Sequence, residues 1–229
     1  GAVGFLQLLP NATSGAHQFL AVGGTSAGQD AIPITVESGL TLVVPATQNT
    51  SGAVGDEVEA TVRGFGAGED VAITWDAGGP APVEVARVTA SSVGRATIAF
   101  AVPSSLPGTH QVAAAGATSG ATAAADFTVL SAVHLSRTSG IAGDAVTVGV
   151  DGYASQEDVE LRWYETATTY TVLAATTTDG TGSGMLTFAV PETTGGDYPI
   201  EVVVAESVAY SDEFAVEPAL TLSPPSGAS

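Results

Sequence analysis

The chain has 229 residues, no cysteine and a formal net charge of −19 at pH 7. Its 24 carboxylates face five arginines and no lysine, which disfavours binding to nucleic acid phosphates and to anionic membrane surfaces. No stretch approaches the roughly 18 apolar residues of a membrane helix. Because the chain has no cysteine and hence no disulfides, its fold is expected to depend on the burial of an apolar core.

The sequence repeats with a period of about 88 residues, which indicates one folded unit used several times in succession. Three landmark pairs lie 88 positions apart: Gly52 and Gly140, Trp75 and Trp163, and Pro103 and Pro191. The question is therefore what a row of such units does.

Residues 1–38 match the second half of a unit and carry no basic start followed by an apolar core, as a signal peptide would. An apolar run closes on Pro10, a glycine follows at Gly15, and an aromatic ring follows at His17. A strand is expected directly after this ring, and a second one ends the segment near Val36.

The segment 39–130 is expected to form one complete unit. Apolar and polar residues alternate along it, as in Val58, Ala60 and Val62, which indicates strands with one buried face. Six strands are expected at 40–44, 58–65, 71–75, 97–102, 110–115 and 126–130.

The segment 131–217 repeats this order, and residues 218–229 begin a further unit. About seven antiparallel strands fit each complete unit, so the expected fold class is all-β, a tandem array of immunoglobulin-like β-sandwiches. Incomplete units at both ends predict that the chain is a stretch of a longer polypeptide. Pro199 lies in a strand expected to be central, where its missing N–H is costly, so that strand is expected to begin at Ile200.

Five rings form the expected core signature of the units. Trp75 and Trp163 fall on the third strand, where an immunoglobulin-like sandwich buries a large ring. His17, His110 and Tyr198 fall near the start of the penultimate strand, at the position of the tyrosine corner.

The recurring pattern resembles the Ig-like repeats of bacterial and archaeal cell-surface proteins. It reads SG-x-x-GD-x-V, then G-F/Y, then EDV-x-φ-x-W, then FAVP-x4-G-x-H/Y, and it covers nearly the whole chain. The resemblance implies a stalk, an adhesin, a surface-layer or filament protein, or an accessory module of a secreted enzyme.

Both asparagines of the chain, Asn11 and Asn49, lie in N-glycosylation sequons within expected loops. A bulky glycan is tolerated in such loops. The sequence leaves open whether these sequons are used or arose by chance.

Carboxylates recur at matching positions of the two units: Glu69–Asp70 matches Glu157–Asp158, and Asp56 matches Asp144. Calcium takes several oxygen ligands from loops of this kind. Asp also stabilises turns through its own backbone, and the sequence leaves both roles open.

No catalytic constellation is found. Serines occur without a recurring acid and His beside them, and His17 and His110 belong to different units and cannot share a metal ion. The irregular stretch between Tyr164 and Tyr170 is the candidate binding loop, because its two rings could stack on a sugar or pack over their own sheet.

The sequence therefore predicts a non-enzymatic, extracellular structural array that gives length, stiffness and contacts with neighbouring copies or other surface proteins. Connections between units are nearly absent, which predicts a stiff rod. The alternative is an adhesin or a carbohydrate-binding accessory module of a secreted protein. No cofactor, nucleic acid or membrane insertion is expected in this segment.

Overall fold

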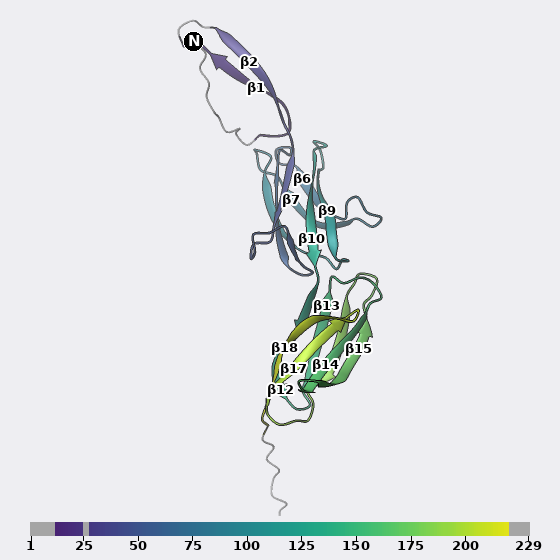
Figure 1. Cartoon of the computed structure of the whole chain (residues 1–229). Coiled ribbons are helices and arrows are strands. Elements are labelled where there is room, and N and C mark those ends of the chain that lie inside the picture. The colour runs from purple at the N-terminus through teal and green to yellow at the C-terminus, as the bar shows by residue number, and fades with distance from the viewer. Residues whose placement is uncertain (1–11, 25–27, 220–229) are drawn as a thin grey trace, which may run out of the picture. The chain divides into compact units, whose positions relative to one another are not determined.

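The computed structural model describes residues 12–24 and 28–219, and within these ranges every regular element is a β-strand (Figure 1). The chain falls into two compact units with their main boundary between Val129 and Leu130. No helix in the described part has the length and apolar character that a membrane crossing requires. The all-β fold with tandem sandwich units is as expected from the sequence.

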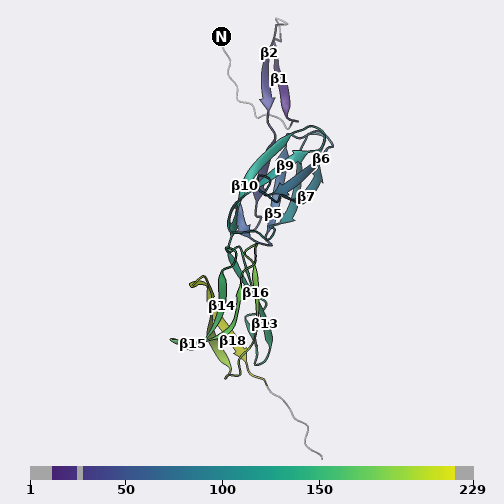
Figure 2. The ribbon, with the colours of Figure 1, turned by 90° about the vertical axis from the view of Figure 1, so that its right-hand side faces the viewer.

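The first two strands form an antiparallel hairpin, visible as a two-stranded ribbon in Figure 2. Strand β1 (Gly15–Val22) pairs along its whole length with β2 (Gln29–Val36). The pairing of Gly15 with Val36 has the same phase as that of Gly108 with Val129 further along the chain. The hairpin therefore repeats the last two strands of a unit.

The first sandwich packs a sheet of three strands against a sheet of five. The smaller sheet has the order β3 (Gly39–Val43), β5 (Glu57–Arg63), β8 (Ala96–Ala101). The larger has the order β4 (Ser51–Ala53), β10 (Thr122–Leu130), β9 (Gly108–Gly116), β6 (Asp70–Trp75), β7 (Val83–Thr89).

The second sandwich repeats this strand order. Its smaller sheet runs β11 (Ala132–Leu135), β13 (Ala145–Asp151), β16 (Gly184–Ala189). Its larger sheet runs β12 (Ser139–Ile141), β18 (Ser207–Glu217), β17 (Gly196–Val204), β14 (Asp158–Thr166), β15 (Thr169–Thr177). Figure 1 shows β18, β17, β14 and β15 side by side in this order.

Each sandwich has eight strands rather than about seven, and the second sandwich contains a parallel contact in place of the expected antiparallel one. The three-residue strand β12 pairs in parallel with β18, because the chain crosses from the smaller to the larger sheet without reversing direction. The four-part division into 1–38, 39–130, 131–217 and 218–229 stays a prediction.

Each sandwich has its own apolar core, built by strands that bury every second residue. Val58, Ala60 and Val62 on β5 are fully buried, and so are the matching valines of β13. Each fully buried valine contributes about 2 kcal/mol relative to an exposed one. The alternation read in the sequence therefore marks the inner face of each sheet.

Pro199 lies inside β17, which begins at Gly196 rather than at Ile200. Strand β17 pairs with β18 from Gly196 onward, whereas its pairing with β14 begins only at Ile200. The prediction that the strand begins at Ile200 was therefore wrong. The missing N–H of Pro199 is tolerated because β17 has only β18 as a neighbour at that position. The ladder with β14 does begin at Ile200.

Candidate functional site

The two tryptophans lie at equivalent depths in equivalent surroundings. Trp75 is 2% exposed and stacks on His110 at 5.1 Å, while Trp163 is 1% exposed and stacks on Tyr198, also at 5.1 Å. In both sandwiches a phenylalanine of the last strand packs against the indole at 57–58°. The tryptophans and phenylalanines are buried in the centre of each core, whereas His110 and Tyr198 are partly exposed and pack against it.

The ring at the start of the penultimate strand also fastens the preceding loop. The Tyr198 hydroxyl donates to the backbone carbonyl of Thr194 at 3.0 Å, which is the geometry of a tyrosine corner. His17 makes the matching contact in the hairpin, where its Nε2 lies 2.8 Å from the carbonyl of Thr13. A carbonyl oxygen only accepts, so Nε2 carries the proton there.

The recurring SG-x-x-GD pattern forms a tight turn. The Asp56 carboxylate accepts a hydrogen bond from the Ala53 N–H at 2.8 Å, and Asp144 does the same for Ile141. A Cβ at Gly52 would lie 2.8 Å from that carboxylate, and Gly55 has a positive φ of 87°. These two carboxylates therefore stabilise turns, which was the alternative to a calcium site.

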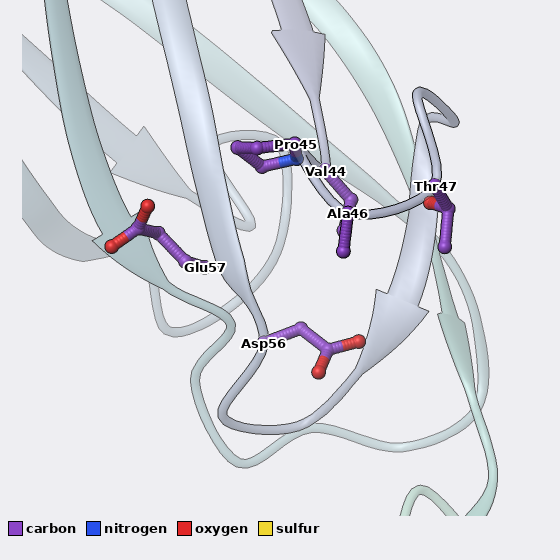
Figure 3. A pocket seen from close by; sticks show the side chains of 6 residues that line it. All are labelled: Val44, Pro45, Ala46, Thr47, Asp56 and Glu57. Carbon is purple, nitrogen blue, oxygen red and sulfur yellow. The ribbon is translucent and has the colours of Figure 1, made fainter.

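A surface hollow of about 360 Å³ adjoins this turn in the first sandwich (Figure 3). Val44, Pro45, Ala46, Thr47, Asp56 and Glu57 line it. The two carboxylates point to opposite sides in Figure 3, and Asp56 is engaged by its own turn. The hollow thus offers no set of converging polar groups from its lining that would orient a ligand.

Glu69 is a buried carboxylate whose role the sequence analysis missed. It is 5% exposed and accepts hydrogen bonds from the backbone N–H groups of Gly66, Thr118 and Ser119 and from the hydroxyls of Thr118 and Ser119. Burial alone would raise its pKa, but these donors outweigh burial and lower the pKa to about 2. Glu69 therefore fastens the loop after β9 to the loop before β6.

The second sandwich secures the corresponding region differently. The loop between β17 and β18 is a tight turn at Ala205 and Glu206, and the Thr178 hydroxyl bridges the Ala154 carbonyl and the Glu157 N–H. Groups of three or more His, Cys, Asp or Glu able to hold a metal ion do not occur among residues 12–24 and 28–219. Glu157 takes part through its backbone N–H, so its carboxylate does not repeat the role of the Glu69 carboxylate.

Asn49 is exposed in the turn between β3 and β4. Its backbone carbonyl accepts a hydrogen bond from the Val44 N–H at 2.8 Å, which fixes the turn. Asn11 lies outside the described residues. The structure therefore presents one of the two sequons on a defined surface turn.

Tyr164 and Tyr170 lie on strands β14 and β15, so the expectation of an irregular loop was wrong, while their role in binding stays a prediction. They are direct partners on β14 and β15, and only residues 167–168 turn between them. The Thr166 hydroxyl accepts from the Thr169 N–H at 3.1 Å and closes this turn. The tyrosines thus share the outer face of the larger sheet of the second sandwich.

Charged side chains surround the two rings. Arg162 lies over the Tyr170 ring, 4.8 Å from its centroid, and donates to Glu160 at 2.9 Å. The Tyr164 hydroxyl donates to Glu201 at 2.8 Å, a hydrogen bond that raises the pKa of Tyr164. The period-two alternation of β14 places Glu160, Arg162 and Tyr164 on one face, a signal present in the sequence but not used there.

Comparisons with known proteins match a family model to the first sandwich and solved structures to larger parts of the chain. The family model of the macroglobulin-like domain matches residues 40–129. No curated protein matches the chain in sequence.

The similar solved structures include three of low identity. The ectodomain of the teleost fish polymeric Ig receptor has 11% identity and a TM-score of 0.39, with 81% of this chain and 100% of that chain covered. The tetra-tandem repeat in the extending region of a large adhesion protein has 17% identity and a TM-score of 0.35, with 90% and 57% covered. The Yersinia pseudotuberculosis adhesin InvE has 15% identity and a TM-score of 0.32, with 78% and 59% covered. The chain thus spans less than two thirds of the length of these last two structures.

Proposed function

We propose that this chain is part of an extracellular, non-enzymatic structural array, such as a stalk, a surface-layer protein or a filament. Its units would supply length and stiffness and would contact neighbouring copies or other surface proteins. The observation that carries the proposal is the repetition of one eight-strand order, with one ring cluster, in two successive sandwiches.

The connection between the sandwiches supports a role as a spacer. Strand β10 ends at Leu130 and β11 begins at Ala132, so Ser131 alone separates them. The second unit begins at Leu130, directly after Val129 of the first, so no flexible linker of several residues stands between the two units.

Small-angle X-ray scattering of the purified chain tests this proposal. A spacer predicts a single narrow distribution of interatomic distances that does not change between low and physiological salt. Insertion of a Gly-Ser linker of eight residues after Ser131 provides the comparison, because it should broaden the distribution. If the unmodified chain already has the broad distribution of the linker variant, the structural proposal fails.

A second candidate function, binding of carbohydrate, is favoured by the paired tyrosines of the second sandwich, which have no counterpart in the first.

A further inference from the structure

We infer that the outer face of the larger sheet in the second sandwich binds a neutral carbohydrate chain, with Tyr170 as the ring on which a sugar stacks. This inference goes beyond the structural role and does not depend on it. It commits the second candidate function to one surface, one ligand class and named residues.

The side chains that build this face come from three adjacent strands. Val159, Leu161 and Trp163 of β14 are buried in the core, so Glu160 and Arg162 lie on the opposite side of the sheet. Arg162 pairs across the sheet with Val172 of β15 on one side and with Glu201 of β17 on the other. Tyr164 and Tyr170 continue this face toward the end of the hairpin.

The two rings are held in place before any ligand arrives. Their centroids are 5.3 Å apart at an interplanar angle of 48°, and the hydrogen bond to Glu201 fixes Tyr164. Tyr170 is nevertheless 44% exposed. A fixed, exposed ring binds at low entropic cost, and its electron-rich face attracts the weakly positive C–H groups of a pyranose.

Carboxylate oxygens beside the rings can accept hydrogen bonds from the hydroxyls of a sugar. Glu201 accepts from Tyr164 through Oε2, and Glu160 accepts from Arg162 through Oε2. In the part of the chain that the structure describes, Oε1 of each carboxylate accepts no hydrogen bond. Asp158, Glu160, Arg162, Val203 and Glu206 line an adjoining hollow of about 190 Å³, where a second sugar unit could rest.

The electrostatics of this face favour a neutral ligand. One arginine, already paired with Glu160, stands among the carboxylates of Asp158, Glu160, Glu201 and Glu206, so an anionic sugar would be repelled. Arg162 covers one face of the Tyr170 ring, so a sugar would have to stack on the opposite face. An uncharged sugar avoids the repulsion by the carboxylates.

The first sandwich shows the same sheet without these groups. At the register positions of Arg162 and Glu201 it has Thr74 and Ala113, which pair with each other in the same way. Ala72 and Asp76 replace Glu160 and Tyr164 by sequence phase. The first sandwich has the same strand order without the cluster of rings and charges, so the fold does not depend on this cluster. The cluster is a feature in which the second unit differs from the first.

The inference is tested by titrating the whole chain with four neutral hexasaccharides: cellohexaose, chitohexaose, mannohexaose and xylohexaose. At least one is expected to bind. Tyr170→Val should weaken its binding by about tenfold, and Tyr170→Phe should leave it within about twofold because the ring remains. Met185→Ala, on the exposed face of the opposite sheet, should have no effect.

Three outcomes would overturn the inference. The first is that none of the four hexasaccharides binds at millimolar concentration, and the second is that Tyr170→Val leaves the binding unchanged. The third is that only sialylated or sulfated glycans, titrated in parallel, bind. Far-ultraviolet circular dichroism verifies that each variant is folded, and Arg162→Gln serves as a second variant on the same face if Tyr170→Val is unfolded.

Discussion

The carboxylate of Glu69 joins two loops that the strands of the first sandwich do not connect. Five donors from Gly66, Thr118 and Ser119 converge on it. Its folded-state pKa of about 2 lies below the ordinary value of 4.5, so the folded protein binds this proton less readily than the unfolded chain. Its contribution to stability is complete above about pH 4.5 and is lost as the pH falls through about 2.

Glu69→Gln is therefore expected to destabilise the first sandwich by about 2 kcal/mol at pH 7, because hydrogen bonds to a charged acceptor are replaced by weaker ones. Between pH 4.5 and 2 the free energy of unfolding of the variant should also decrease less than that of the unmodified protein. Urea unfolding across this range measures both effects.

Glu157→Gln is the matched control, since Glu157 holds the same position in the second unit and its carboxylate accepts no hydrogen bond from the described residues. Its effect is expected to be about 0.5 kcal/mol or less. Equal losses in the two variants would contradict the role assigned to Glu69.

Asn49 is the sequon that the structure presents on a surface turn. Its side chain is exposed, and the turn is fixed by backbone atoms, so a glycan would not disturb the bridge to Val44. Peptides of the native protein that contain Asn49 are expected to carry a glycan mass that enzymatic deglycosylation removes. Finding only the unmodified peptide mass would contradict the prediction.

At the scale of elements, the hairpin β1–β2 carries the pattern of an inner sheet face, and within residues 12–24 and 28–219 it forms a two-stranded sheet of its own. Phe19 is 38% exposed and Ile32 is 62% exposed. By phase they correspond to Val112 and Ala125 of the first sandwich, and Val112 is fully buried there. The same sequence position is thus partly exposed in one copy and at the centre of a core in the next.

Phe19→Ser is expected to lower the fluorescence of a hydrophobic dye such as ANS and to change the free energy of unfolding by about 0.5 kcal/mol or less. Val112→Ser should destabilise the first sandwich by about 3 kcal/mol, because it leaves a cavity and buries a hydroxyl. Dye binding and urea unfolding of the two variants check this contrast. A loss of several kcal/mol for Phe19→Ser would show that the hairpin face is covered in solution.

The strands that sequence reasoning could find are those with buried, alternating residues. Strand β5 buries Val58, Ala60 and Val62, and it was predicted. Strand β15 forms the edge of its sheet, and its first four residues are exposed, so it shows no such alternation. The three-residue strand β12 is too short for any period, and its parallel pairing follows from the crossing between sheets.

The candidate site was predictable only in part for a related reason. The two tyrosines were found as residue types, but Asp76–Pro82 in the first unit is irregular, and this suggested a loop in the second unit as well. Strand β6 ends at Trp75, whereas β14 continues past the matching Trp163 to Thr166. The alternation along β14 could have placed Glu160 and Arg162 beside Tyr164, but Tyr170 and Glu201 join them through strand register, which sequence spacing within one strand does not reveal.

At the scale of the whole molecule, the dominant property is the net charge of −19. Three arginine–carboxylate ion pairs are formed among the described residues, so most carboxylates face solvent or accept hydrogen bonds from uncharged groups. Repulsion among them disfavours the compact state and weakens as salt shortens the Debye length from about 30 Å at 0.01 M to about 8 Å at 0.15 M. Salt is therefore expected to stabilise both sandwiches.

Thermal unfolding in NaCl from 0.01 to 0.5 M is expected to show a rise of several degrees in Tm that levels off as screening becomes complete. CaCl₂ at matched ionic strength should give a similar rise, because Asp56, Asp144 and Glu69 are engaged in turns and loops. A saturating increase at millimolar CaCl₂ that NaCl does not reproduce would instead indicate a specific calcium site. A Tm that is flat or falls with NaCl would show that the repulsion among surface carboxylates does not limit the stability of the fold.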